Sequence, residues 1–444
     1  MQKTEVGKFS TKNILMIGFL FVPILLVTKI HFVNNNLVLN YSTLWIISSL
    51  LYLLANILIK KISIENYHIF FLIVLSVLTQ LSFLNYEPIG SDDIYRYMWD
   101  GKVQANNINP YSYKPIDKEL NELHSNILPS KMNFKEMKTI YFPLSQWLFY
   151  VGFKISGENF WGYKFLIFIS IIISIVLFYK ILVHLNMEKK RLLFFILSPL
   201  IYFQFSIDGH LDAFGLPLLI SSLYFYLKDK KFYSAFFLGL SFSIKPVAIV
   251  LIPLFFLNEK SIADKFKFLI VTIFIFLIQF TPYIFSSNPF EAFIIFSKNW
   301  MFNGFIFTTI NSIIHNNQLA RLITWICLII SLLPIYFGKI ELIKKFYFAI
   351  LLMIIFSPVI HPWYLSWLLI FIPFTNFWSG IYLVSAVSLT SITILVYKMT
   401  GNWKDYYVVQ MIEFIPTIVL MIYELFKLTR FTTNDNSDKY AAKA

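Results

Sequence analysis

The sequence predicts an all-α polytopic integral membrane protein with about 12 to 14 membrane segments and a folded first large loop. Of its 444 residues, 58% are hydrophobic and 14% are charged, and the mean hydropathy is +0.68. Soluble domains carry about 25% charged residues. Apolar runs close to the roughly 20 residues that cross a bilayer recur from near the N-terminus to about residue 427. The membrane bundle is therefore the main body of the protein.

The basic residues of this chain are predicted to set its membrane topology. The net charge is +13, yet Lys and Arg are scattered in short clusters between apolar runs. A nucleic-acid partner would need them gathered on one face, so none is expected. Loops rich in Lys and Arg stay in the cytoplasm. The single cysteine, Cys327, lies in an apolar run and excludes an intramolecular disulfide.

The N-terminal unit, residues 1–86, is predicted to hold three membrane helices, at about 13–33, 38–59 and 67–86. The first starts like a signal peptide, but it is longer than a signal's apolar core and lacks a small-residue cleavage site. With the N-terminal lysines inside, Lys60 and Lys61 also fall inside. The third helix then ends on the extracytoplasmic side.

Residues 87–160 are predicted to form an extracytoplasmic loop with an acidic motif and interfacial helices. Its stretch 87–140 is the longest polar segment of the chain. Loops of this length are usually functional or disordered. The aromatic and proline content, as in "NPYSYKP" and "IYFPLSQWLFY", favours a folded layer at the membrane interface.

Residues 161–428 are predicted to form the main helix bundle, followed by a polar cytoplasmic tail, 429–444. Its spans fall at about 162–184, 191–207, 209–227, 266–285, 319–338, 346–360, 362–376, 379–397 and 406–427. The run 232–257 is interrupted by Lys245-Pro246 and is too short for two crossings. We expect it to re-enter or to form a tight hairpin, which leaves both termini in the cytoplasm.

The start of the predicted loop, "GSDDIYRYMWDG", packs four charged residues into nine positions. Ser91 suits a helix N-cap, and Asp92 and Asp93 in the first turn would be favoured by the helix dipole. Arg96 lies four residues from both Asp92 and Asp100, so ion pairs would explain all three. A purely structural role is therefore one interpretation.

The stretch "GSDDIYRYMWDGKVQANNINPY" also resembles the first extracytoplasmic loop of GT-C glycosyltransferases, particularly bacterial mannosyltransferase-like members that use a polyprenyl-phosphate sugar. Further similar motifs follow in the same order over about residues 80–375: "YFPLSQWLF", "DGHLDAFGLPLL", "SIKPVAIVLIPLF", "WMFNG" and "SPVIHPWYLSWLLIF". The resemblance implies a GT-C-like bundle that moves a hexose, with mannose favoured, from a polyprenyl-phosphate donor to a glycan or lipid acceptor. It also implies an extracytoplasmic site and inversion at carbon 1.

The resemblance places the catalytic acids at Asp92 and Asp93. Related enzymes often space them Asp-x-Asp, whereas here they are adjacent and would point about 100° apart on a helix. Which of the two is the general base stays open. Phosphate leaves as a stable anion, so one base and cations to hold the phosphate suffice. The predicted phosphate partners are Arg96, Lys245 and Lys298.

Further residues of these motifs are predicted to contact substrate: Tyr97, Asp100, His210, Asp212, Trp300, Asn303, His361, Trp363 and Tyr364. Several keep a second interpretation. Asp208, His210 and Asp212 would suit a divalent metal, hydrogen bonds or sugar contacts. Lys245 would face a phosphate or extend to an interface. An aromatic belt would explain Trp363 and Tyr364 without catalysis.

The alternative function is a multi-pass transporter or a flippase for lipid-linked sugars, since intramembrane ionisable residues and broken helices also build substrate pathways. A noncatalytic assembly subunit is a third interpretation. No cofactor is indicated with certainty, and no glycine-rich motif suggests a sugar-nucleotide donor. The expected partners are the bilayer, the lipid-linked donor and the acceptor, in a bacterial plasma (inner) membrane.

Overall fold

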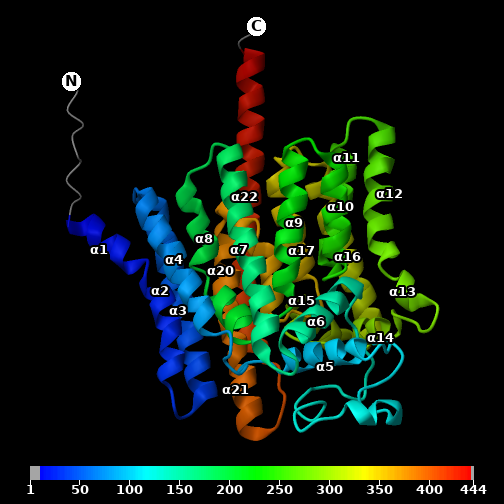
Figure 1. The fold of residues 1–444 in the computed structure, drawn as a ribbon. Helices are drawn as coiled ribbons and strands as arrows, with labels where there is room; N and C mark the ends of the chain where they lie inside the picture. The colour runs from blue at the N-terminus through cyan, green and yellow to red at the C-terminus, as the bar shows by residue number, and fades with distance from the viewer. Residues whose placement is uncertain (1–10, 442–444) are drawn as a thin grey trace.

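The computed structural model describes residues 11–441. These residues form a bundle of helices that stand side by side, with a layer of shorter helices and loops across one end (Figure 1). The described part contains no strand, and its only β-pairing is a pair of isolated bridges from Phe302 and Asn303 to Val359. The all-α class is confirmed.

The N-terminal helices are α1 (Thr11–Phe19), α2 (Val22–Thr28), η1 (Lys29–Phe32), α3 (Leu37–Lys61) and α4 (Asn66–Ser82). Together α1, α2 and η1 supply an apolar segment, Asn13–Phe32, long enough to cross a membrane. Pro23 lies in the first turn of α2, where the proline's missing N–H is not needed by the helix. The predicted first membrane helix is therefore present, with a break just before Pro23. Lys3 and Lys8 lie outside the described residues.

The predicted loop is folded and contains α5 (Asp93–Ala105), η2 (Lys118–Leu123) and α6 (Pro143–Ser156). Figure 1 shows α5 lying across the end of the bundle, with the segment that follows it outside. Gly101 allows α5 and α6 to pack closely, because a Cβ at this position would collide with the carbonyl oxygen of Phe149. Most side chains of α5 are buried, including Arg96 and Asp100.

The chain then forms α7 (Phe160–His184), η3 (Lys189–Leu192), α8 (Leu193–Ile196), η4 (Ile201–Ile207) and α9 (Asp212–Leu227). The path bends by 59° between the helical pieces 189–196 and 201–207. The second piece, η4, is a π-helical turn, a feature often found at functional sites. It ends at Asp208, and Gly209 follows with a left-handed φ of +76°. The segment from Asp208 to Asp212 therefore lies at a break between η4 and α9.

The predicted hairpin over 232–257 is present as α10 (Lys231–Phe242), η5 (Pro246–Leu251) and α11 (Ile252–Asn258). The 12 residues of α10 span about 18 Å, well short of a bilayer core of about 30 Å. The chain turns at Lys245 and returns, so α10 begins and α11 ends at the same end of the bundle (Figure 1). Lys245 lies at the tip of this hairpin.

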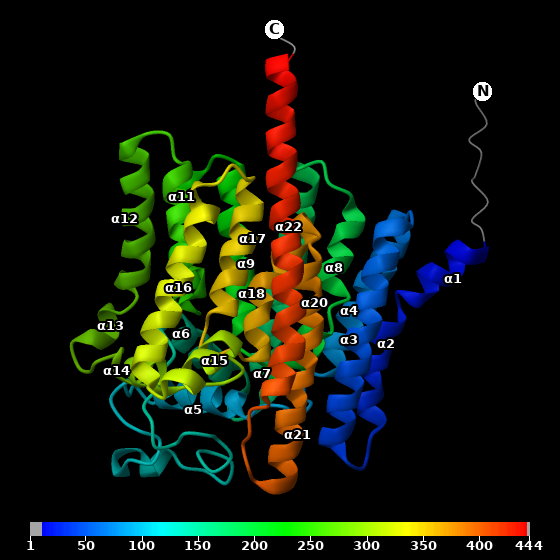
Figure 2. The same ribbon diagram turned by 180° about the vertical axis from the view of Figure 1, so that it is seen from behind.

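The remaining helices complete the bundle. They are α12 (Ile262–Ile278), α13 (Thr281–Ile284), α14 (Glu291–Asn299), α15 (Phe305–Ile314), α16 (Asn317–Phe337), α17 (Leu342–Ile355), η6 (Pro362–Leu365), α18 (Ser366–Leu369), α19 (Ile372–Thr375), α20 (Trp378–Ala386), η7 (Val387–Thr390), α21 (Ser391–Thr400) and α22 (Tyr407–Ala441). Figure 2 shows α22 crossing the whole bundle. It extends into the predicted polar tail, as far as Ala441, rather than ending before it.

Within residues 11–441, six helical segments are long and apolar enough to cross a membrane, or seven if the bent pair counts as one span. They are Asn13–Phe32, Leu37–Lys61, Phe160–His184, Asn317–Phe337, Trp378–Thr400 and Tyr407–Thr429. The other predicted segments are short or broken: α4 has 17 residues, α9 has 16, and the run 362–376 is divided among η6, α18 and α19. The polytopic class is confirmed, while the larger predicted count includes these partial spans.

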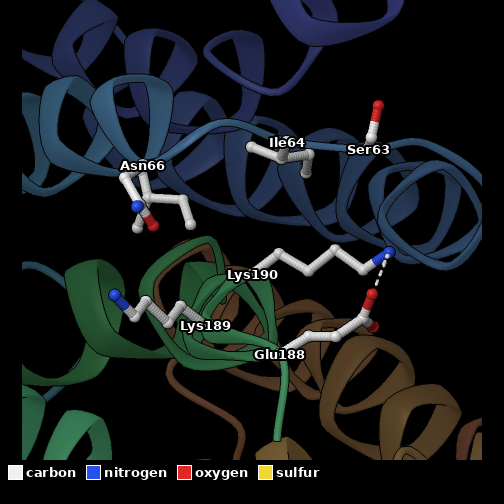
Figure 3. A pocket seen from close by; sticks show the side chains of 7 residues that line it. Ser63, Ile64, Asn66, Glu188, Lys189 and Lys190 are labelled. Atoms are coloured by element: carbon white, nitrogen blue, oxygen red, sulfur yellow. Dashed lines mark ion pairs between the residues drawn. The ribbon is translucent and has the colours of Figure 1, made fainter. Parts of the chain in front are cut away.

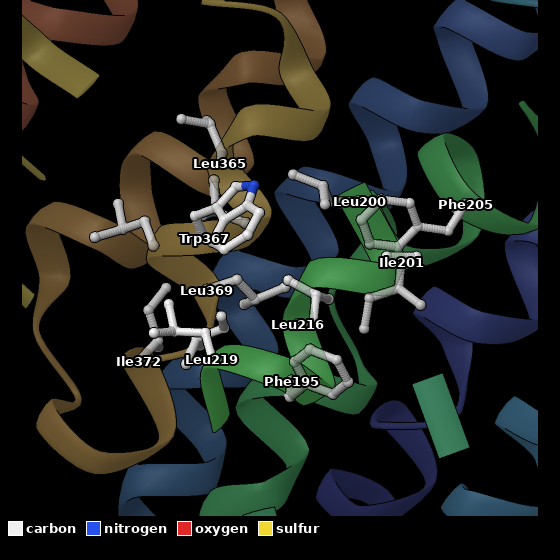
Figure 4. Packing of buried hydrophobic residues seen from close by; sticks show 14 of the residues in the cluster. Phe195, Leu200, Ile201, Phe205, Leu216, Leu219, Leu365, Trp367, Leu369 and Ile372 are labelled. Atoms are coloured by element: carbon white, nitrogen blue, oxygen red, sulfur yellow. The ribbon is translucent and has the colours of Figure 1, made fainter. Parts of the chain in front are cut away.

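Trp367 is fully buried in the core of the bundle and packs against α9, the helix that carries Leu216 and Leu219 (Figure 4). Gly215 makes this contact feasible, because a Cβ there would collide with the indole ring. Small residues allow membrane helices to approach closely. The packing also brings the indole N–H of Trp367 within reach of Asp212.

The basic connections between helices lie at the end of the bundle opposite α5 (Figures 1 and 2). These are α3–α4, α7–η3, α9–α10, α11–α12 and α16–α17. At this end, Lys189, Lys190 and Glu188 border a small cavity of about 220 Å³, with the Lys190 Nζ 3.2 Å from the Glu188 Oε1 (Figure 3). The acidic start of α5 and the basic connections are therefore separated by the length of the bundle.

Candidate active site

Asp208 fixes the segment that leads into α5. Its Oδ1 accepts hydrogen bonds from the backbone N–H of Ile89 (3.0 Å) and of Gly90 (2.8 Å), and its Oδ2 accepts one from the Tyr41 hydroxyl. Gly90 is needed here, because a Cβ would lie 2.6 Å from the Asp208 Oδ2. The carboxylate thus attaches the start of α5 to the bundle.

Lys164 makes a second attachment at the same place. Its side chain is buried, and its ammonium donates to the carbonyl oxygens of Tyr86 and of Ile207 (2.6 Å). These bonds join the segment after α4 to the end of η4. Neither Lys164 nor Tyr41 was predicted as a site residue. The sequence does hold one signal for Lys164, because a charged residue inside the apolar run 162–184 indicates a functional or structural role.

Asp92 and Asp93 face different surroundings. The Asp93 Oδ2 lies 3.6 Å from the Nδ1 of His210, which follows η4. The Asp92 Oδ1 lies 3.8 Å from the Nζ of Lys398 on α21, and its Oδ2 accepts a hydrogen bond from the Asn133 amide (3.3 Å). Asp93 therefore faces the bundle, and Asp92 faces the loop and α21.

The electrostatic surroundings of Asp93 suit a general base. Burial raises the pKa of Asp93 to about 7, and the negative charge of Asp92 acts in the same direction. The Lys245 ammonium lowers the pKa but offsets only part of this rise. A carboxyl group that titrates near neutral pH can accept a proton during a reaction at that pH.

Lys245 is held close to Asp93 by an ion pair with Asp212. Its Nζ lies 2.6 Å from the Asp212 Oδ1 and 3.4 Å from the centre of the Tyr364 ring. The Trp367 indole donates to the same Asp212 oxygen (2.8 Å), whereas the Asp212 Oδ2 is buried and has no hydrogen-bond partner among the described residues. The lysine thus contacts the site rather than extending to an interface.

A column of stacked rings runs beside Asp93. The rings of His210 and Trp363 stack at 3.5 Å, those of Trp363 and His361 at 4.5 Å, and those of His361 and Phe302 at 4.8 Å. Trp363 thus stacks with two histidine rings, and its role in substrate binding stays a prediction. Within the described residues, neither ring nitrogen of His210 has a hydrogen-bond partner. The column positions His210 next to Asp93.

Arg96 and Asp100 form a buried network of their own. The Arg96 Nε donates to the Asp100 Oδ1 (2.8 Å), and its Nη1 donates to the Met137 carbonyl oxygen (3.0 Å). The Asp100 Oδ2 accepts from the Thr139 hydroxyl (2.6 Å) and from the Gln146 amide (2.9 Å). Of the two ion pairs open to Arg96 in the sequence, the structure contains the one with Asp100.

Tyr97 stands between this network and the acid. Its ring stacks on Phe149 (4.5 Å) and meets Tyr141 edge on, and its side chain is buried. Tyr141 belongs to the "YFPL" motif and lies close enough to interact electrostatically with Asp93. It was not among the predicted site residues.

The structure does not bring the predicted residues of the "SKNWMFNG" segment into these contacts. Lys298 is exposed and forms no ion pair within residues 11–441. The ring of Trp300 stacks on Phe296, and the buried Asn303 donates to the Glu413 carboxylate (2.7 Å). Their roles in substrate binding stay predictions.

The residues considered for a metal have other partners. Asp208 binds Tyr41 and the backbone before α5, while Asp212 binds Lys245. In the part of the chain that the structure describes, no three His, Cys, Asp or Glu side chains are grouped to hold a metal ion. Asp208 and Asp212 therefore take part in hydrogen bonds within the protein.

Two family models match the chain and give its class, a membrane mannosyltransferase. Residues 30–259 match the MptA_B family, described as "Alpha-(1->6)-mannopyranosyltransferase, N-terminal domain", and residues 306–427 match the MptB C-terminal domain. The first match covers more than half of the chain, so the chain belongs to the MptA_B family. No curated protein and no solved structure matches it.

The family assignment confirms the predicted resemblance and the prediction of a glycosyltransferase rather than a transporter or flippase. The N-terminal match includes α5, the Asp208–Asp212 motif and Lys245. The C-terminal match includes His361 and Trp363. The residues gathered around Asp93 thus come from both matched parts of the chain.

Proposed function

We propose that the enzyme transfers mannose from a polyprenyl-phosphate donor to a hydroxyl group of a glycan or lipid acceptor at the extracytoplasmic face, with inversion at carbon 1. A β-linked donor then gives an α-mannoside, as the family description requires. The observation that carries this proposal is the position of Asp93, which lies at one end of a helical membrane bundle beside a lysine and has a pKa raised to about 7.

Asp93 acts as the general base in this proposal. The acceptor oxygen attacks carbon 1 of the mannose while its proton moves to an Asp93 carboxylate oxygen. The bond between carbon 1 and the phosphate oxygen breaks, and its electron pair leaves with the polyprenyl phosphate. Asp92 is the weaker candidate for the base, because it faces Lys398 and Asn133 rather than His210.

Lys245 is the proposed partner of the leaving phosphate. Its ammonium has three donors, and the structure uses one of them on Asp212. Positive charge placed where a phosphate leaves stabilises the transition state. Arg96 is engaged with Asp100 and Met137, and Lys298 is exposed without an ion pair, so both fit this role less well.

The outer surface of the bundle supports a lipid-linked donor. Large apolar side chains are exposed on α12 and α16, among them Ile270, Phe274, Leu277, Leu322 and Ile329. Such a surface suits contact with lipid. A polyprenyl tail can stay in the bilayer while its phosphate and sugar reach the end of the bundle at Asp93.

The donor is tested with purified enzyme and radiolabelled mannose. Polyprenyl-phosphate mannose and a nucleotide-linked mannose are offered separately with the same mannoside acceptor. The proposal requires transfer from the lipid donor alone, with an α-linked product. Transfer from the nucleotide donor alone would overturn it.

The membrane side is tested by labelling a single cysteine. Cys327 is replaced by Ser and a cysteine is introduced at Ala105, the last residue of α5. An impermeant thiol reagent should label this variant in intact cells. Labelling only after lysis would place the site in the cytoplasm. A cysteine in place of Lys230, in the α9–α10 connection, is the matched control and should show the reverse pattern.

A further inference from the structure

A second cavity lies at the α5 end of the molecule and includes none of the residues assigned above. Its volume is about 420 Å³, within the range of roughly 300–1,000 Å³ typical of small-molecule sites. We call it the Tyr95 pocket. It is lined by Asn85, Glu87, Tyr95, Lys131, Asn159 and Phe160, with Ile127 and Glu158 beside them.

The Tyr95 pocket is built from segments far apart in the chain. The Glu87 Oε1 accepts a hydrogen bond from the Tyr95 hydroxyl (2.7 Å) and lies 2.8 Å from the Lys131 Nζ. The rings of Tyr95 and Phe160 meet edge to face at 5.5 Å. These contacts join the segment before α5, α5 itself, the loop after η2 and the start of α7.

Asp92 is close to both the Tyr95 pocket and Asp93, the first residue of α5. Tyr95 follows Asp93 by two residues, and Asn133, which donates to the Asp92 carboxylate, follows Lys131 by two residues. Asp92 is thus the neighbour of Asp93 in the chain and interacts electrostatically with Tyr95 of the pocket. The Tyr95 pocket and Asp93 are therefore linked through the first turn of α5.

The chemistry of the lining favours a neutral, hydroxyl-rich ligand. Both carboxylates of the lining are paired, Glu87 with Lys131, so a phosphate would find no excess of positive charge there. Glu158 is already bound to Lys102 (2.6 Å) and to the Ser125 hydroxyl (2.6 Å). The side-chain amides of Asn85 and Asn159 can bond hydroxyl groups. The other donors of Lys131 and the Oε2 of Glu87 can do the same. Tyr95 and Phe160 add apolar ring edges.

We propose that the Tyr95 pocket binds a sugar unit of the acceptor glycan, one or more units away from the hydroxyl group that reacts at Asp93. This proposal rests on the proposed function, because it takes the acceptor to be a glycan. The cavity in Figure 3 cannot have this role, since it lies at the opposite end of the bundle. Longer acceptors should therefore bind more tightly than a single mannoside.

The test compares a long and a short acceptor, α-(1→6)-mannotetraose and octyl α-mannoside. Lys131→Ala and Asn159→Ala each remove hydrogen-bonding groups from the pocket. Each should raise the KM for the tetraose about 3- to 10-fold, the range expected for one lost hydrogen bond, and leave kcat and the KM for octyl α-mannoside unchanged. Lys138→Ala is the matched control, because Lys138 pairs with Glu291 outside the pocket (3.0 Å).

Two results separate the failure of this proposal from that of the proposed function. If the wild-type enzyme transfers mannose to both acceptors and the pocket variants keep the wild-type KM for the tetraose, the pocket proposal is wrong and the proposed function stands. If the wild-type enzyme transfers mannose to neither acceptor, binding is measured by saturation-transfer NMR. Tetraose binding that Lys131→Ala weakens then supports the pocket alone, and unchanged or absent binding overturns it.

Discussion

The start and the middle of α5 carry aspartates in contrasting environments. The Asp100 side chain is 2% exposed and its carboxylate has partners on both oxygens: Arg96, Thr139 and Gln146. The Asp93 side chain is 29% exposed, and its Oδ2 lies 3.6 Å from the Nδ1 of His210. Asp100 has every feature of a structural carboxylate. Asp93 remains free to exchange a proton.

This difference shows that position on a charged helix does not decide the role of an acid. Asp93 and Asp100 lie on one helix of 13 residues and belong to one sequence motif. The two carboxylates differ in the number of hydrogen bonds that they accept. Burial raises the pKa of Asp93 to about 7, whereas both oxygens of Asp100 are held by hydrogen bonds from neighbouring side chains.

The largest effect on catalysis is expected from Asp93→Asn. Asparagine has nearly the same shape but cannot accept the hydroxyl proton as a base, so the rate of mannose transfer should fall about 10²- to 10⁴-fold. The rate is measured with purified enzyme at saturating donor and acceptor. The unfolding temperature should stay near that of wild type, and a rate within threefold of wild type would remove Asp93 from the base role.

Asp100→Asn should instead affect folding. The substitution leaves the buried guanidinium of Arg96 without its charged partner, which costs about 3–5 kcal/mol for a buried ion pair. Thermal unfolding in detergent should show a clear loss of stability. If the variant is as stable as wild type but inactive, Asp100 takes part in the reaction and the contrast along α5 is wrong.

Gly90→Ala should disturb the attachment of α5 to the bundle. The added Cβ would lie 2.6 Å from the Asp208 Oδ2 and 2.7 Å from the Tyr41 hydroxyl oxygen. Overpacking of this kind costs about 1–3 kcal/mol, and transfer should fall because Asp93 shifts. Gly18→Ala is the control, since a Cβ there meets nothing within 4 Å. Equal stability and activity in the two variants would contradict this account.

Asp92→Asn should have the smallest effect on the maximal rate. Within residues 11–441, the Asp92 carboxylate has two longer contacts, to Asn133 (3.3 Å) and to Lys398 (3.8 Å). We expect kcat within about 10-fold of wild type, well above the value for Asp93→Asn. Steady-state kinetics of the two variants side by side decide which adjacent acid is the base.

The sequence was sufficient to predict the membrane class, the folded loop and the hairpin at Lys245, because these depend on apolar length and on one proline. It also located Asp93, His210, Asp212 and Lys245 within short motifs. It did not distinguish Asp92 from Asp93, since that choice depends on where η4 and α21 pack.

Other features of the site were not accessible from the sequence. The attachment through Asp208 and Lys164 joins backbone groups of segments more than 40 residues apart, which no local spacing reveals. The count of membrane segments exceeded the number of long helices because apolar runs such as 362–376 break at prolines. The hydrogen bond from Asn303 to Glu413 on α22 likewise joins residues 110 positions apart, and local spacing does not indicate it.

The most direct test of Asp93 as the base is the pH dependence of kcat/KM in wild type and in Asp92→Asn. The base must be ionised, so in wild type kcat/KM should fall about tenfold per unit as the pH drops below about 7. Removing the Asp92 charge removes one cause of the raised pKa, and the fall should then begin at lower pH. A flat wild-type profile between about pH 5 and pH 7, or an unshifted profile in the variant, would contradict the account.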